Sequence, residues 1–126
     1  MLTDKEIEQA KREVQYSLKE GGHHEHPDCI RIAYEWLDAQ IKTKNPSKKH
    51  RAIKHIIEDW GGRYVSQTDV DVAAHLHPEI KGTYPYFNVS AELTLPDSFR
   101  LAQIGEAHAH GKTPDPKDYK HREKGL

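Results

Sequence analysis

The sequence predicts an α+β domain that is mostly helical, with about four to five helices and one small β-element. Apolar residues recur at helical spacing in several segments that begin or end at capping residues, prolines or glycine pairs. Only the stretch near 86–95 alternates apolar and polar residues with the period of a strand. The 126 residues fit one domain, and only 35% of them are hydrophobic, so we expect a small core under a highly charged surface.

The first helix is predicted over about residues 3–20. Thr3 and Glu6 have the spacing of a capping box, in which the hydroxyl accepts from a free amide and the carboxylate reaches back. Gly21 and Gly22 are expected to end the helix. Its apolar stripe consists of Ile7, Ala10, Val14 and Leu18.

Prolines mark the starts of the next two helices. Pro27 suits the first helical position because it lacks an amide hydrogen that would need a partner. A third helix is expected over about 47–60, with its start signalled by Asn45-Pro46 or by Ser47. Gly61 and Gly62 then stop it.

The centre of the fold is expected between Ser66 and Leu95. Ser66 and Asp69 form a second capping-box pattern, and Pro78 ends or kinks the helix that follows. A single strand cannot satisfy its own backbone, so the strand near 86–95 needs a partner. The candidates are residues 63–66 and the same strand of a second subunit, which would make a homodimer.

A last short helix can begin at Asp97 or Ser98. We expect a single globular domain over 1–110, and a mobile polar C-terminal tail over 111–126, because that segment contains hardly any apolar residues. No apolar run approaches the roughly 18 residues that a membrane helix needs. Cys29 is the only cysteine, which favours an intracellular, cytoplasmic protein without disulfides or membrane contact.

The net charge of −1 conceals a basic segment over residues 42–54. Lysine and arginine bind phosphates without regard to base sequence, so this face predicts a small, non-catalytic nucleic-acid-binding regulator. A winged-helix-like order would follow, with helix 47–60, strand 63–66, helix 67–77 and a returning strand. The candidate contact residues are Lys42, Lys44, Lys48, Lys49, Arg51, Lys54 and His55.

An alternative function is a protein-binding regulator or inhibitor of a host protein, of the kind that mobile elements encode. It would use the aromatic strand region 84–95, because Tyr and Phe are enriched in interface cores and a strand edge can recruit a partner strand. The candidate interface residues are Tyr84, Tyr86 and Phe87. The competing interpretation is that these rings cover the protein's own core.

A third hypothesis is a zinc-binding protein, and without zinc we expect no cofactor. Imidazole and thiolate are good zinc ligands, and four candidates lie close together, His23, His24, His26 and Cys29. The chain has no second cysteine and no HExxH motif, so the pattern matches no complete site. Cys29 near histidines also has the composition of a nucleophilic site, but its place on the apolar side of a helix favours an inert thiol.

Overall fold

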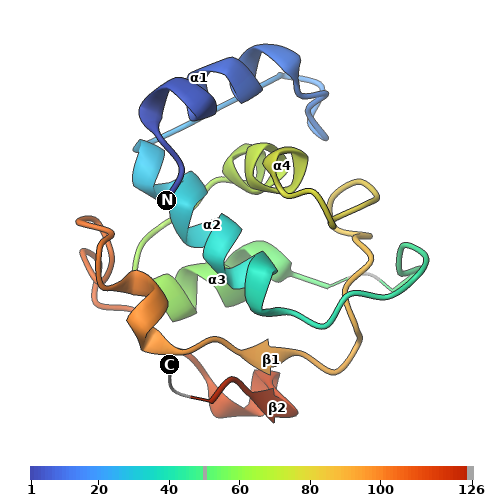
Figure 1. The fold of residues 1–126 in the computed structure, drawn as a ribbon, viewed down its shortest axis with the longest axis vertical. Helices are drawn as coiled ribbons and strands as arrows, with labels where there is room; N and C mark the ends of the chain where they lie inside the picture. Colours follow the sequence, from blue (N-terminus) through green and yellow to red (C-terminus); the bar gives the residue numbers. More distant parts are fainter. Residues whose placement is uncertain (50, 125–126) are drawn as a thin grey trace.

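The computed structural model describes residues 1–49 and 51–124, and within them the fold is mostly helical α+β, as predicted. The α-helices are α1 (Asp4–Glu13), α2 (Pro27–Ala39), α3 (Ile53–Gly61) and α4 (Gln67–Leu76). The strands β1 (Thr94–Leu95) and β2 (His121–Arg122) form a parallel pair, and η1 (Ser98–Leu101) and η2 (Pro116–Asp118) are 3-10 helices. Helix α1 and the strands lie at opposite ends, with the other helices between them (Figure 1).

Helix α1 begins as predicted and ends early. The Thr3 hydroxyl accepts from the Glu6 amide at 3.1 Å, and the Glu6 carboxylate accepts from the Thr3 amide, so the capping box is confirmed. The expected end near residue 20 is wrong, because Val14 already has extended backbone. Beyond it the Ser17 amide donates to Asp71 on α4 at 2.9 Å. A contact distant in sequence therefore replaces the next helical turns.

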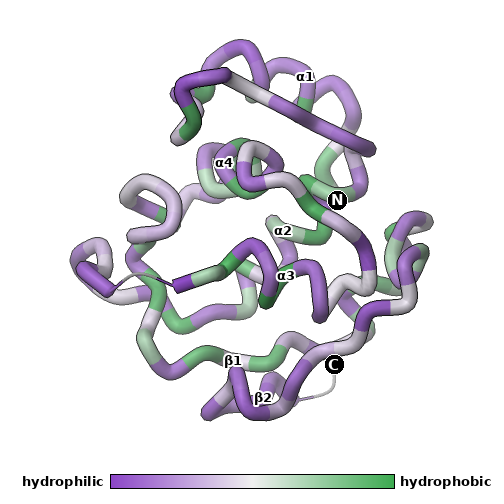
Figure 2. Tube along the Cα trace, turned by 180° about the vertical axis from the view of Figure 1, so that it is seen from behind, coloured by the Kyte–Doolittle hydropathy of each residue, from purple (hydrophilic) through white to green (hydrophobic). Residues whose placement is uncertain are grey.

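Helices α2 and α4 make the largest helix–helix contact and form the centre of the core. Pro27 occupies the first turn of α2, as predicted, and the Ser66 capping box opens α4. Ile41 lies beyond the end of α2 and is 51% exposed. The polar outer surface, including most of α1, surrounds this apolar centre (Figure 2). None of the described helices has the length and apolar character needed to span a bilayer.

Helix α3 begins at Ile53 rather than near residue 47, so residues 42–49 and 51–52 of the basic segment lie outside a helix. The reason is that this backbone bonds elsewhere: the Thr43 amide donates to the Asn88 carbonyl at 2.8 Å, and the Ser47 amide to the Phe87 carbonyl at 3.0 Å. A chain fixed in this way cannot make helical i→i−4 bonds. The end of α3 is as predicted, with Gly62 in the left-handed conformation.

The strand expected near 86–95 is reduced to the two residues of β1. The first part of that stretch instead bonds to the basic segment, with an isolated antiparallel bridge between Lys42 and Val89. Residues 63–66 form no strand, so they are not the partner. Without that strand, and with 78–87 non-helical, the winged-helix-like arrangement is absent from the described residues. Pairing of 86–95 with a second subunit stays a prediction.

The C-terminal segment supplies the partner of β1. The Lys120 amide donates to the Leu93 carbonyl at 3.0 Å, and the Glu123 amide to the Leu95 carbonyl at 2.9 Å. The Trp36 indole donates to the Tyr119 hydroxyl at 3.0 Å. These residues belong to the segment 111–126, which was expected to be a mobile tail, and they bond to the rest of the domain; the mobility of the segment as a whole stays a prediction. Its sparse apolar content gave no indication of these contacts, because backbone hydrogen bonds, one aromatic residue and the Glu123 carboxylate make them.

Gln40 links the end of α2 to β1 through a buried amide. Its Nε2 donates to the carbonyls of Trp36 and Thr94 at 3.0 and 2.8 Å, and its Oε1 accepts from the Thr94 amide at 2.9 Å. Only 4% of Gln40 is exposed, so water cannot replace these bonds. The Gln40 side chain thus gives the backbone of β1 the hydrogen bonds that a neighbouring strand gives in a larger sheet.

Replacing Gln40 with Leu is expected to lower the free energy of unfolding by about 2–4 kcal/mol, since two buried backbone groups of Thr94 lose their partners and each costs about 1–3 kcal/mol. Urea unfolding followed by circular dichroism measures the change. The exposed Gln103→Leu serves as the control and should change stability by less than about 0.5 kcal/mol. Equal effects of the two variants would contradict the role of Gln40.

Candidate nucleic-acid interface

The basic loop, residues 42–51 as far as the structure describes them, presents cations to solvent. Lys44, Lys48 and Lys49 are exposed and form no ion pair with any described residue. Lys42 differs, because its ammonium donates to the Asp38 carbonyl at 2.6 Å and partial burial lowers its pKa. Three of the predicted contact residues are therefore available to an anionic partner.

The remaining predicted residues of this face contact the protein itself. The Arg51 guanidinium donates to the Ala91 carbonyl. The Lys54 ammonium and the His55 ring lie 2.6 and 3.3 Å from the two carboxylate oxygens of Glu58. Burial opposes the charge of Glu58, but Lys54 and the Val65 amide outweigh it and hold its pKa below the ordinary value. Lys54 and His55 thus stabilise a buried carboxylate instead of forming a free basic face.

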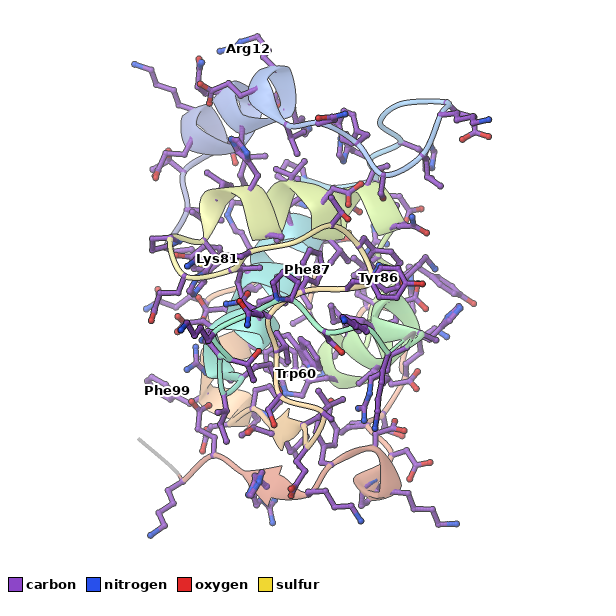
Figure 3. The ribbon with its side chains drawn as sticks, turned by 90° about the vertical axis from the view of Figure 1, so that its right-hand side faces the viewer. Arg12, Trp60, Lys81, Tyr86, Phe87 and Phe99 are labelled. Carbon is purple, nitrogen blue, oxygen red and sulfur yellow. The ribbon has the colours of Figure 1, made fainter. Side chains whose placement is uncertain are left out.

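The structure brings a second basic segment, residues 117–124, next to this loop. Arg51 holds the Ala91 carbonyl, while the amides of Lys120 and His121 hold the carbonyl of Leu93, two residues further on. Its exposed cations, none with an ion pair to a described residue, are Lys117, Lys120, Arg122 and Lys124. Figure 3 shows nitrogen-tipped side chains extending from this end of the molecule.

An internal ion pair removes acidic charge from the C-terminal segment. Glu123 accepts two bonds of 2.7 Å from the Arg100 guanidinium, and these bonds lower its pKa. Arg100 also contacts Glu35 and Asp38, both at 2.9 Å. Since the carboxylate points inward to Arg100, the neighbouring lysines and Arg122 form no ion pair with any residue in the described part of the chain. The charge pattern of the sequence contained these cations, but not the direction in which the acid points.

The aromatic residues proposed for a protein interface mostly face the core. Phe87, labelled in Figure 3, is 2% exposed. Its ring meets the Tyr84 ring edge-on at 6.1 Å. The Tyr84 hydroxyl accepts from the Lys54 amide at 3.1 Å, and burial raises the pKa of Tyr84. Tyr86 is 39% exposed, and Phe99, which the sequence did not single out, is 65% exposed. A protein-binding function stays a prediction. Of the candidates Tyr84, Tyr86 and Phe87, Tyr86 is the one whose side chain is exposed enough to contact a partner.

The three histidines among the candidate zinc ligands each form hydrogen bonds with different parts of the protein. His24 lies 2.7 Å from Asp69 and 2.8 Å from the Tyr16 hydroxyl, which fastens the loop before α2 to α4. The His26 ring accepts from the Asp28 amide as the N-cap of α2. His23 contributes its backbone, to Thr68 at 2.9 Å. In the part of the chain that the structure describes, no three histidine, cysteine or acidic side chains are grouped to hold a metal ion.

Cys29 is buried on α2, where its thiol donates to the Tyr64 carbonyl at 3.3 Å. Burial raises its pKa to about 11, so the thiolate that nucleophilic catalysis requires is disfavoured at neutral pH. The geometry therefore indicates a structural thiol.

We expect the Cys29 thiol to react with a disulfide reagent at pH 8 only when the protein unfolds, and thiol release followed by absorbance measures the rate with and without denaturant. The folded state binds the thiol proton more tightly than the unfolded state, so the stability from this group is complete below the unfolded pKa, near 9. This stability is lost as the pH rises toward about 11. The difference in free energy of unfolding between the native protein and Cys29→Ala should therefore narrow between pH 9 and about 11.

In the reactivity experiment, rapid reaction of the folded protein at pH 8 would show an accessible thiol and contradict the structural role of Cys29.

No family model matches the chain, and no curated protein or solved structure matches it either. The roles assigned to its residues therefore rest on their own contacts, burial and charge.

Proposed function

We propose that this protein binds nucleic acid through a basic band made of the basic loop and the segment 117–124. The observation that supports this most directly is the set of exposed lysines, Lys44, Lys48 and Lys49, which have no ion pair to a described residue. They occupy a segment without a single acid between Ala39 and Ile57. Cations of this kind neutralise phosphates and release counterions, which supplies affinity for any nucleic-acid sequence.

The distribution of ion pairs supports the proposal further. Acids of the helical body are matched to cations within it, as Asp28 is to Arg31 at 2.7 Å and Glu106 to Arg63 at 2.9 Å. None of the lysine and arginine side chains in the basic band forms an ion pair with a described residue, although the chain as a whole has a net charge of −1. Its positive potential is therefore local, and local fields rather than the overall charge determine which anions approach.

The expected mode of binding is contact with the phosphate backbone. Lysine ammonium groups are flexible point charges, which bind phosphates well but read base edges poorly. The basic loop carries no aromatic side chain on which a base can stack. Binding should therefore depend strongly on salt and weakly on base sequence, and no catalytic step on the nucleic acid is proposed.

Lys48→Ala with Lys49→Ala is expected to weaken binding to duplex DNA and to flatten its salt dependence. Each lost phosphate contact lowers the slope of log affinity against log salt by about 0.9. Fluorescence anisotropy at several salt concentrations, on duplex and single-stranded DNA and RNA, measures both quantities. The matched control is Lys5→Ala with Lys19→Ala, two exposed lysines at or near α1 that remove the same charge. If the two double variants lose affinity equally, a local interface at the basic loop is refuted.

Lys120→Ala with Arg122→Ala tests whether the second segment belongs to the same interface. Both side chains are exposed on the segment that pairs with residues 93–95, so their loss should weaken DNA binding while leaving thermal stability nearly unchanged. The same anisotropy titration and a melting curve provide the two measurements. Unchanged affinity would restrict the interface to residues 42–51.

A further inference from the structure

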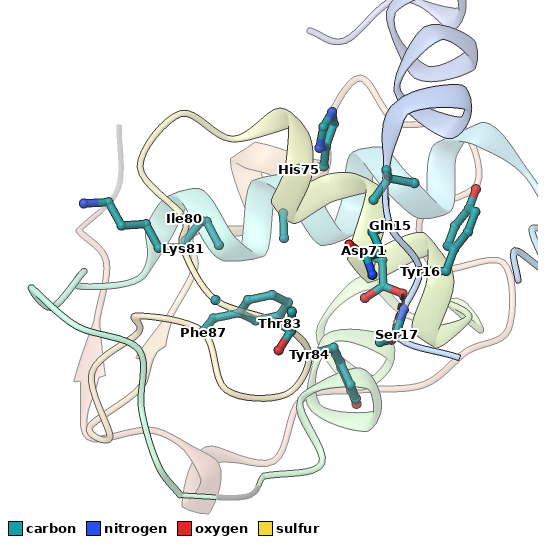
Figure 4. Close-up of a pocket in the computed structure, with 13 residues that line it drawn as sticks. Gln15, Tyr16, Ser17, Asp71, His75, Ile80, Lys81, Thr83, Tyr84 and Phe87 are labelled. Atoms are coloured by element: carbon teal, nitrogen blue, oxygen red, sulfur yellow. Dashed lines mark hydrogen bonds between the residues drawn. The ribbon is translucent and has the colours of Figure 1, made fainter. Parts of the chain in front are cut away.

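A cavity of about 440 Å³ lies between α4, the segment after α1 and the loop 80–87. Its size falls within the range of pockets that hold small molecules, roughly 300–1,000 Å³. Val14, Ile80 and Phe87 supply apolar walls, and Ser17, Asp71 and Thr83 supply polar groups (Figure 4). None of these residues belongs to the basic band.

Asp71 is the chemically distinctive group of this cavity. It is 6% exposed, and no described cation forms an ion pair with it, whereas the other buried acids, Glu58 and Asp69, lie against Lys54 and His24. Burial accordingly raises its pKa. Isolated buried carboxylates are costly unless a cation or hydrogen bonds compensate them.

Hydrogen bonding leaves one oxygen of Asp71 available. The amide and the hydroxyl of Ser17 both donate to Oδ2, at 2.9 and 2.7 Å, and Oδ1 accepts no bond from a described residue. Figure 4 shows the carboxylate directed toward Ser17, whereas the His75 ring and the Lys81 ammonium extend away from it. Neither side chain therefore fills the position beside Oδ1.

This geometry distinguishes between classes of cation. A guanidinium donates in a planar fork that matches both oxygens of a carboxylate, and here Ser17 already occupies one of them. An ammonium is a compact charge with three donors and needs one oxygen from each acceptor. The Thr83 hydroxyl, which has no bond to a described residue, is a further acceptor on the same cavity wall.

We propose that the cavity binds a small aliphatic primary amine, whose ammonium pairs with Oδ1 of Asp71. The hydrocarbon chain of the amine then lies against Val14, Ile80 and Phe87. Tyr16 and Tyr84 also line the cavity. This ligand site is independent of the nucleic-acid interface.

The experiment is a titration of isotope-labelled full-length protein with n-butylammonium chloride, followed by amide chemical shifts in NMR spectra. We expect saturable shifts at the amides of Ser17, Asp71 and Thr83. n-Butanol, which has the same chain without the charge, should cause none. Equal shifts with n-butanol would overturn the proposal, as would the absence of saturable shifts with the amine.

Two variants and one control locate the site. Asp71→Asn retains an acceptor for Ser17, so the fold should persist, and the Kd for n-butylammonium should rise by about tenfold or more. Ala74→Leu narrows the cavity while retaining the carboxylate, and it should also weaken binding. Asp59→Asn removes one charge outside the cavity and should leave the Kd unchanged within about twofold. Binding that both cavity variants retain would overturn the proposal.

A last arm separates a free amine from a lysine side chain. Nα-acetyl-lysine methylamide carries the same ammonium on a peptide-like unit that is bulkier than n-butylamine. The proposal expects it to bind more weakly than n-butylammonium at a site of this size. Tighter binding of the lysine derivative would assign the cavity to a partner protein's lysine and refute the small-amine ligand.

Discussion

The fold depends on hydrogen bonds from buried polar side chains to the backbone of irregular segments. Helices and two short strands cannot satisfy the peptide groups of residues 78–95, and an unpaired buried peptide group is costly. Asn88, which is 2% exposed, donates to the carbonyls of Thr43 and Glu79 and accepts from the Lys81 amide. The Gln40 side-chain amide likewise forms hydrogen bonds with the backbone amide and carbonyl of Thr94 in β1. These two amides hold long loops against a small apolar core, and the basic loop owes its position to one of them.

Ion pairs within the protein determine the surface charge. Acids that pair with cations in the body of the protein no longer offset the cations at its edge. Arg100 illustrates this, because it gathers Glu35, Asp38 and Glu123 around one guanidinium. A chain with a net charge of −1 thereby presents a basic band, and the proposed affinity for nucleic acid follows from the arrangement rather than from the total charge.

Helix α4 has a different role, since its buried face carries one structural carboxylate and the carboxylate of the proposed amine site. Asp69 closes the capping box of the helix and pairs with His24, so its charge is compensated inside the protein. Asp71, two residues later, faces Ser17 and the cavity, and no described cation compensates it. The proposed amine site thus arises from a local difference between two carboxylates on one helix. It shares no side chain with the basic band, so the two proposed functions can succeed or fail separately.

The sequence by itself determined the fold class and the ends of the helices that have local signals. The residues that begin or end these helices act on neighbouring backbone groups, so the sequence alone is enough to predict their effect. They are Thr3, Pro27, Gly62 and Ser66. Only the tertiary structure decided where α1 ends, which segment pairs with residues 86–95, and which cations remain unpaired. Each of these depends on a partner far along the chain: Asp71 for the residues after α1, Asn88 for the basic loop, and Arg100 for the C-terminal acid. Periodicity and local charge carry no information about such partners, because the bonds form only after the core has brought the segments together.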